Sequence, residues 1–135
     1  MYKNILLPIV PGHTEDIQNA MDVAKQLGDD GAKFTVMHVM ETIPGYVMGQ
    51  IPDNVVAQRR IDTQQALEHI AADLPGASAE LVSGHAGQTI INYANDHDVD
   101  CIILASHATR LEAFFIGSTA NRVVHLAKCA VHVIR

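Results

Sequence analysis

The segment with the clearest chemical potential is ASHATRLEAFFIGSTANRV, residues 105–123, which contains Gly117-Ser118-Thr119 at the expected start of a helix. The first N–H groups of a helix have no partner within the helix, and they lie at the positive end of its dipole. Such a helix start binds phosphate, and the hydroxyls of Ser118 and Thr119 add further donors. The alternative is that Ser118 only caps the helix, which contributes about 1 kcal/mol to its stability.

The same segment contains His107 and Arg110, which are candidate partners for a phosphate. Arginine is permanently charged, whereas a histidine carries charge only when it is protonated. Residues 101–135 hold one acid, Glu112, and four Lys or Arg residues, although the whole chain has a net charge of -6. This uneven distribution favours an anionic ligand near the segment. Chance clustering, and an arginine that is simply solvated, are the alternative explanations.

Motifs for several classes of enzyme are absent from the sequence. There is no G-x-x-x-x-G-K-[ST] loop, no G-x-G-x-x-G fingerprint and no G-x-S-x-G elbow, so hydride transfer and nucleophilic chemistry are not predicted. The eight histidines form no zinc-binding pair on a helix, and we expect no metal site. Slow ATP hydrolysis would need a water-positioning acid, for which residues 101–135 offer only Glu112. We therefore expect a protein without catalytic activity.

Length and composition indicate one globular domain over residues 1–135, with 48% hydrophobic and 18% charged residues. The acidic balance argues against a nucleic-acid partner. No apolar run approaches the roughly 20 residues that span a bilayer, and MYKNILLPIV does not resemble a signal peptide. We therefore expect no membrane partner and a cytoplasmic location. Cys101 and Cys129 lie in or beside apolar runs and are expected to be reduced core thiols.

Apolar periodicity predicts strands that alternate with helices along the chain. The expected strands cover residues 2–10, 33–40, 78–83, 100–106 and 130–134, and the expected helices cover about 14–27, 53–74, 88–97 and 117–127. Asp53 is expected to cap the second helix. The apolar segment 41–53 has two glycines and two prolines, so it is expected to be a loop without regular structure.

This alternation predicts an α/β fold: a five-stranded parallel sheet with helices on both faces, Rossmann-like, with strand order 3-2-1-4-5. Ligands of such sheets bind beyond the carboxyl ends of the strands, where the direction of winding switches. Here the switch falls between the first and fourth strands. It brings together the residues at the ends of those two strands, which are Pro8, Ile9 and Val10 on the first and Ala105, Ser106 and His107 on the fourth.

Five blocks of the sequence resemble the universal stress protein family (UspA-like): KNILLPI, VMHV, Gly84, DCIILASH and IGSTANRVVHLAKCAVHVIR. The resemblance implies a five-stranded parallel fold, a homodimer formed through the strand at residues 130–134, and binding of ATP or AMP, with Mg²⁺ as a possible companion ion. It places adenine near Pro8, Ile9 and the backbone of Val39. It places the phosphates near Ala105, His107, Ala108, Gly117, Ser118 and Thr119. Ser106 and Arg110 are further candidates for binding the nucleotide.

The sequence departs from the nucleotide-binding members of that family at three positions and in the length of one spacer. Those members carry G-x2-G-x9-G-[ST] after the fourth strand, whereas this chain has Ala105, Ala108 and an eight-residue spacer before Gly117, as in the UspF-type branch. Val10 stands where many members have an aspartate that contacts the nucleoside. An alanine destabilises by about 1 kcal/mol only where φ must be positive, so weakened binding is expected rather than none.

The resulting expectation is an adenine-nucleotide-binding regulator of the stress response. The alternative, from a different class, is a UspA-like dimer that binds no nucleotide and serves as a protein-interaction module, with the apolar segment 41–53 as its contact surface.

Overall fold

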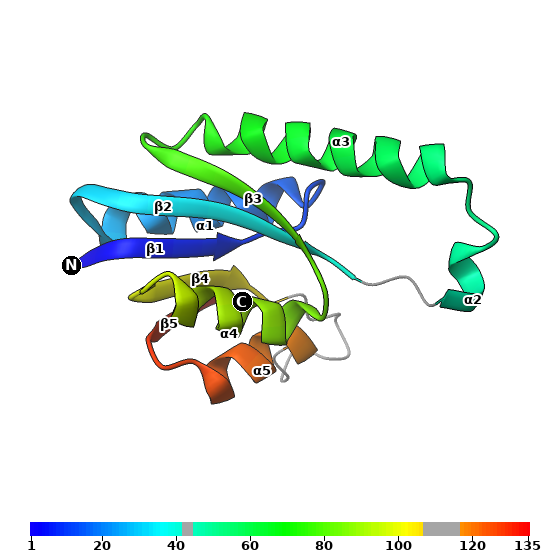
Figure 1. The fold of residues 1–135 in the computed structure, drawn as a ribbon. Coiled ribbons are helices and arrows are strands. Elements are labelled where there is room, and N and C mark those ends of the chain that lie inside the picture. The colour runs from blue at the N-terminus through cyan, green and yellow to red at the C-terminus, as the bar shows by residue number, and fades with distance from the viewer. Residues whose placement is uncertain (42–44, 107–116) are drawn as a thin grey trace.

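The structure of the 135-residue chain is a computed structural model, and it describes residues 1–41, 45–106 and 117–135. Five strands form one parallel sheet in the order β3-β2-β1-β4-β5, which confirms the predicted fold class (Figure 1). The strands are β1 Tyr2–Pro8, β2 Gly28–Met40, β3 Ala77–Ser83, β4 Cys101–Ala105 and β5 Ala130–Ile134.

Helices cover both faces of the sheet, because the strands are apolar on both sides. The helices are α1 Thr14–Leu27, α2 Gly45–Met48, α3 Asp53–Ala71, α4 Ala86–Asp96 and α5 Ser118–Leu126. Along β1, Ile5 and Leu7 pack into one core with α1 and α3, whereas Leu6 packs into a second core with α4 and α5. This alternation follows from the two-residue period of a strand. It leaves the sheet buried between two helical layers (Figure 1).

Backbone hydrogen bonds fix the pairing of β1 with β4 at the amino ends of the strands. The Asp100 carboxylate accepts hydrogen bonds from the backbone N–H groups of Lys3, at 2.9 Å, and Asn4, at 3.0 Å. The Asp100 N–H donates in turn to the Asn4 carbonyl at 2.9 Å. Ile5 therefore pairs with Cys101. This register determines where the two strands end relative to each other at the opposite edge of the sheet.

Three local predictions were wrong. Residues 45–48 form the short helix α2 instead of irregular loop, since the turn-forming Gly49 and Pro52 lie beyond this helix rather than within it. The cap of α3 is Pro52, and no side-chain hydrogen bond caps the helix, so Asp53 is the first helical residue. The strand β2 begins at Gly28 rather than at residue 33, because it continues directly from the end of α1.

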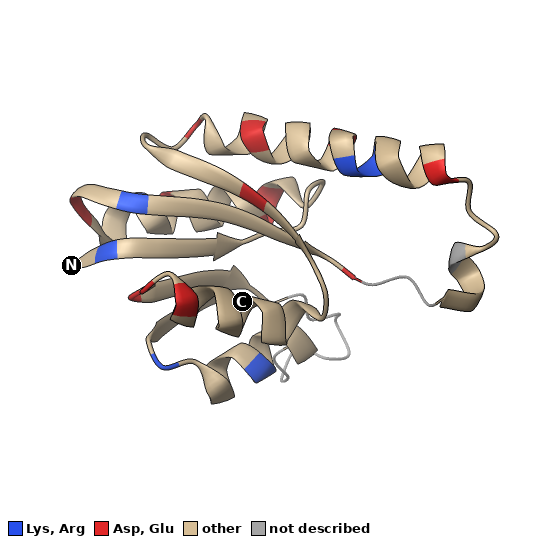
Figure 2. Ribbon diagram, viewed as in Figure 1, with Lys and Arg blue, Asp and Glu red and all other residues tan. Residues whose placement is uncertain are grey.

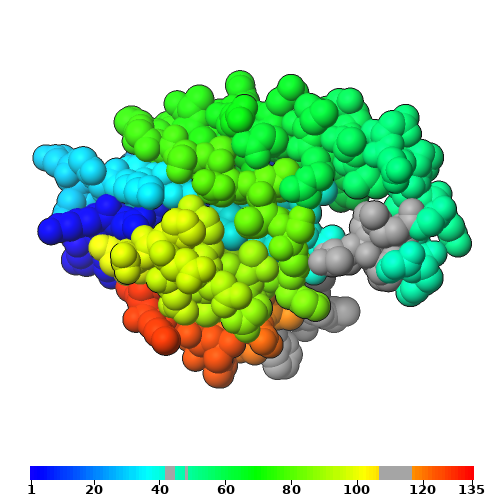
Figure 3. Space-filling view, in the orientation of Figure 1, coloured from blue at the N-terminus to red at the C-terminus, as the bar shows by residue number. Residues whose placement is uncertain are grey.

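The helix α3 reaches beyond the sheet, and α2 lies past its far end (Figures 1 and 3). The buried residues of α3, Leu67 and Ala71, lie near the C-terminal end of this helix. Only that part of the helix packs into the core. No helix in the described part of the chain is long and apolar enough to cross a membrane.

Leu67→Ala is expected to lower the free energy of unfolding by about 2 to 5 kcal/mol, because Leu67 is fully buried and the truncation leaves a cavity. Ile61→Ala in the same helix is the control, since Ile61 is 51% exposed, and its change should stay within about 0.5 kcal/mol. Urea denaturation followed by circular dichroism measures both. Equal losses in the two variants would contradict this account of how α3 packs.

Candidate functional site

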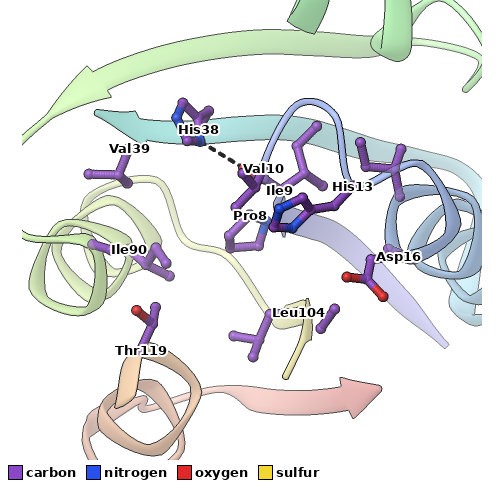
Figure 4. A pocket seen from close by; sticks show the side chains of 14 residues that line it. Pro8, Ile9, Val10, His13, Asp16, His38, Val39, Ile90, Leu104 and Thr119 are labelled. Atoms are coloured by element: carbon purple, nitrogen blue, oxygen red, sulfur yellow. Dashed lines mark hydrogen bonds between the residues drawn. The ribbon is translucent and has the colours of Figure 1, made fainter. Parts of the chain in front are cut away.

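A pocket of about 130 Å³ lies at the carboxyl ends of β1 and β4, at the predicted switch point (Figure 4). Residues from both helical layers line it together with the strand ends: Pro8, Ile9, Val10, His13, Asp16, Ile17, Ala20, His38, Val39, Ala86, Ile90, Leu104, Ala105 and Thr119. Its wall is mostly apolar, with a few polar side chains, as is typical of pockets for small organic ligands. Pockets that enclose a whole ligand usually measure about 300 to 1,000 Å³, so this pocket encloses only part of one.

Hydrogen bonds hold the end of β1 that forms the floor of the pocket. The Ile9 N–H donates to the Met37 carbonyl at 2.8 Å, and the Ile9 carbonyl lies 2.9 Å from His38 Nδ1. Because a carbonyl can only accept, His38 Nδ1 carries the hydrogen, which fixes the tautomer of the neutral ring. The backbone of Ile9 is thus already hydrogen-bonded within the protein.

A polar groove of about 740 Å³ lies between the starts of α4 and α5 and shares Ala86 and Thr119 with the pocket. The other lining residues are Glu41, His85, Gly87, Gln88, Ser118, Asn121, Arg122, His125 and Leu126. Among the described residues, α5 carries Arg122 and no acid (Figure 2). The pocket and the groove therefore adjoin each other at Ala86 and Thr119.

The start of α5 is held by a hydrogen bond across residues 107–116. The Gly117 N–H donates to Ser106 Oγ at 2.9 Å, and Gly117 is the N-cap residue. Ser118 is therefore the first helical residue, and no side-chain hydrogen bond caps the helix, so the interpretation of Ser118 as a cap is wrong. The N–H groups of the first turn that follow Gly117 have no partner within the helix.

Two polar residues of the groove are held by α4. Arg122 donates to Gln88 Oε1 at 3.1 Å, and its side chain lies so close to Gly87 that a Cβ there would be 2.8 Å from Arg122 Cδ. Glu41, at the end of β2, accepts a hydrogen bond from the Ala86 N–H at 3.2 Å. Gly87 is needed because any side chain would displace the arginine.

The structure brings most of the predicted site residues together. Six line the pocket, namely Pro8, Ile9, Val10, Val39, Ala105 and Thr119. Ser118 lines the groove, and Ser106 and Gly117 bond to each other. His107, Ala108 and Arg110 lie outside the described residues.

The alanine at position 105 is compatible with its backbone. Ala105 is the last residue of β4, and Asp98 is the one described non-glycine residue with positive φ. A glycine is therefore not required at position 105. The destabilisation of about 1 kcal/mol that an alanine causes at a position of positive φ therefore does not arise at position 105.

Sequence reasoning missed three polar residues of the pocket, His13, Asp16 and His38. A signal for Asp16 was available, because the helix that follows the first strand of such a sheet begins at the switch point. No comparable signal pointed to His38, whose position depends on the pairing of β2 with β1.

Both cysteines are free, and the expectation of core thiols holds fully for Cys101. Cys101 is 1% exposed, whereas Cys129 is partly buried and packs against the core. Burial raises the pKa of the Cys101 thiol to about 11, with smaller contributions from Cys129 and Asp100. Burial also raises the pKa of Cys129. Neither thiol is ionised at neutral pH, and the described residues contain no group of side chains that could hold a metal ion.

The fold and the pocket define a doubly wound α/β protein with a pocket at the switch point of its sheet. The chain belongs to the universal stress protein family, whose model matches residues 1–135. It is 24% identical to a universal stress protein of Methanothermobacter thermautotrophicus, covering 100% of this chain and 97% of the relative. It is 29% identical to universal stress protein A homolog 1 of Coxiella burnetii, covering 96% and 94%. The structure of UspA from Lactobacillus plantarum superposes with a TM-score of 0.72 at 26% identity, covering 99% and 98%.

Several more distant proteins with this fold have been solved with adenine nucleotides. They include a protein from Archaeoglobus fulgidus with dAMP (18% identity, TM-score 0.63, covering 99% and 98%). A protein from Arabidopsis thaliana carries AMP (14% identity, TM-score 0.63, covering 98% and 90%). A further universal stress protein is in complex with cAMP (14% identity, TM-score 0.64, covering 99% and 97%). At these identities the likeness to this chain concerns the fold alone.

Ser106→Ala is expected to lower the free energy of unfolding by about 1 to 2 kcal/mol, because the Gly117 N–H loses its acceptor. Ser118→Ala is the matched control and should change stability by less than about 0.5 kcal/mol, since Ser118 makes no capping bond. Chemical denaturation of both variants tests the account. If Ser118→Ala lowers the free energy of unfolding more than Ser106→Ala does, Ser118 is the N-cap residue and this account of the helix start is wrong.

Proposed function

We propose that this protein binds an adenine nucleotide, AMP or ATP, and acts as a regulator of the stress response without catalytic activity of its own. The observation that carries the proposal is the continuity of the apolar pocket with the polar groove at the start of α5. A nucleotide has the same division into a flat apolar base and an anionic phosphate. The AMP, dAMP and cAMP complexes of distant family members support this ligand class.

The adenine ring fits the apolar part of the site, between Pro8 at the end of β1, Ile9 directly after it, Val39 of β2 and Ile90 of α4. Val10 is 39% exposed and offers the base an apolar surface rather than a carboxylate. Burying apolar area contributes roughly 25 cal/mol per Å². The base therefore supplies most of the hydrophobic stabilisation of the complex.

The phosphates fit the groove at the start of α5, next to Ser118 and Thr119. The helix dipole and the first-turn N–H groups attract an anion there. Arg122 adds a permanent positive charge on the same helix. Glu41 stands at the α4 side of the groove, so a long phosphate chain meets a negative charge that Mg²⁺ would offset.

Equilibrium dialysis with labelled AMP and ATP, with and without Mg²⁺, tests the proposal. The wild-type protein is expected to bind in a saturable manner with a Kd below about 1 mM. Ala86→Phe should weaken binding more than about tenfold, because Ala86 lines both the pocket and the groove. Ala57→Phe on the exposed surface of α3 is the control and should bind like the wild type. No saturable binding at millimolar nucleotide would overturn the proposal.

A homodimer through β5 is part of this proposal. The strand Ala130–Ile134 pairs with β4 and stands at the edge of the sheet, and most of its residues are half-buried. An open apolar edge promotes pairing with another strand, and a second copy of β5 satisfies it. Sedimentation equilibrium should give twice the monomer mass of 14.6 kDa at micromolar concentration. A monomer under those conditions would contradict the dimer.

The projection of α2 and α3 favours a second candidate, a protein-interaction module that binds no nucleotide. Tyr46 of α2 is 81% exposed, and Val55 near the start of α3 is 51% exposed. The helix α2 and the start of α3 reach beyond the sheet (Figures 1 and 3). Exposed apolar residues of this kind are typical of contact surfaces. The dialysis experiment separates the two candidates, because this one requires that the wild type bind neither AMP nor ATP.

A further inference from the structure

We propose that Asp16 recognises the ribose hydroxyls of the bound nucleotide and thereby makes the site selective for ribonucleotides over deoxyribonucleotides. This inference rests on the proposed function and assigns a specificity-determining residue to the same site. It concerns a residue of the first turn of α1 rather than the end of β1, where Val10 stands.

Asp16 lines the pocket from the α1 side of the sheet, whereas Thr119 lines it from the α5 side. Asp16 is half-buried and is the third residue of α1. In Figure 4 its carboxylate faces the cavity, and Pro8 and Leu104 lie between it and Thr119. The site therefore has a carboxylate on α1 at one end and, at the other end, the start of α5, where the phosphate is proposed to bind.

Asp16 offers the strongest acceptor for a ligand hydroxyl in the pocket. The side chain of Val10 has no polar atom, and the other acceptors, such as the Ile9 carbonyl and the Thr119 hydroxyl, are neutral. Among the described lining residues, Asp16 carries the one carboxylate. Hydrogen bonds to an ionised acceptor are stronger than those to a neutral one, which favours Asp16 for a ligand group that donates.

The groups on a ribose match a site with the Asp16 carboxylate at one end and the start of α5 at the other. Its 2′ and 3′ hydroxyls share one edge of the ring, and the base and the 5′ carbon leave from the carbons beside the ring oxygen on the other edge. An ionised carboxylate only accepts hydrogen bonds and has about four acceptor positions on its two oxygens, so Asp16 can bind both hydroxyls in addition to the interaction that it makes within the protein. With the hydroxyl edge at Asp16, the base points into the apolar wall and the phosphate points toward α5. The carboxylate also repels the phosphate, which opposes the reversed orientation.

A purely structural role for Asp16 is separable from this one, because Glu15 provides a matched comparison. Both acids lie in the first turn of α1, where a negative charge favours the helix dipole. Glu15 is exposed and does not line the pocket. Removal of either charge changes the helix start in the same way, whereas only Asp16 faces the ligand.

Isothermal titration calorimetry of AMP, 2′-deoxy-AMP and 3′-deoxy-AMP tests the inference. The wild type is expected to bind AMP about tenfold more tightly than either deoxynucleotide, since each loses one charge-assisted hydrogen bond. Asp16→Ala should weaken AMP binding by about tenfold and bring all three affinities within about twofold of each other, because it removes every acceptor atom of the side chain. Glu15→Gln should keep the wild-type ratio. Thermal unfolding checks that each variant is folded.

The ratio of the affinity for AMP to the affinities for the two deoxynucleotides is the decisive readout. The charge of Asp16 acts on the phosphate of all three nucleotides in the same way, so this effect cancels in the ratio. Equal wild-type affinity for the three ligands overturns the role of Asp16 and leaves the proposed function standing, and this result needs no variant. A folded Asp16→Ala protein that keeps the wild-type ratio also overturns it. Absence of binding by any of the three overturns both the inference and the proposed function.

Discussion

The parallel pairing of β1 with β4 is the constraint on which the site depends. Helices leave these two adjacent strands toward opposite faces of the sheet, so the carboxyl ends of the strands separate α1 from α5. Asp100 bonds to the backbone of Lys3 and Asn4 and holds the two strands in register at their other ends. A slip of one residue would exchange the two faces of β1 and remove the pocket with them.

The chemistry of the site follows from which helix ends meet there. The polar groove is built by the starts of α4 and α5, and Ser106 ties the start of α5 to the end of β4 through the Gly117 N–H. The Asp16 carboxylate comes from the first turn of α1, on the other side of the sheet. Because α1 and α5 belong to different layers, the distance between this carboxylate and the start of α5 is set by the thickness of the sheet and its packing rather than by any one loop.

The fold could be predicted from the sequence because its signals are local. Apolar runs of β-branched residues, such as the one around Ile102 and Ile103, alternate with segments of helical period, and this pattern leaves few topologies. The strand-end residues Pro8 and Ala105 could be placed for the same reason. The hydrogen bond between Ser106 and Gly117 could not, because it joins residues on either side of residues 107–116. The alternative in which Ser118 caps α5 does not hold, because Gly117 is the N-cap residue. The position of His38 could not be predicted, because the pairing of β2 with β1 decides which residues it contacts.

The central claim is that the pocket between β1 and β4 and the groove at the start of α5 form one nucleotide site. Titration of ¹⁵N-labelled protein with AMP, followed by amide chemical shifts, tests it most directly. The account predicts saturable shifts at the amides of Ile9, Val39 and Thr119, with one dissociation constant for all three. Shifts confined to α2 and α3, or no saturable shift at millimolar AMP, would contradict it.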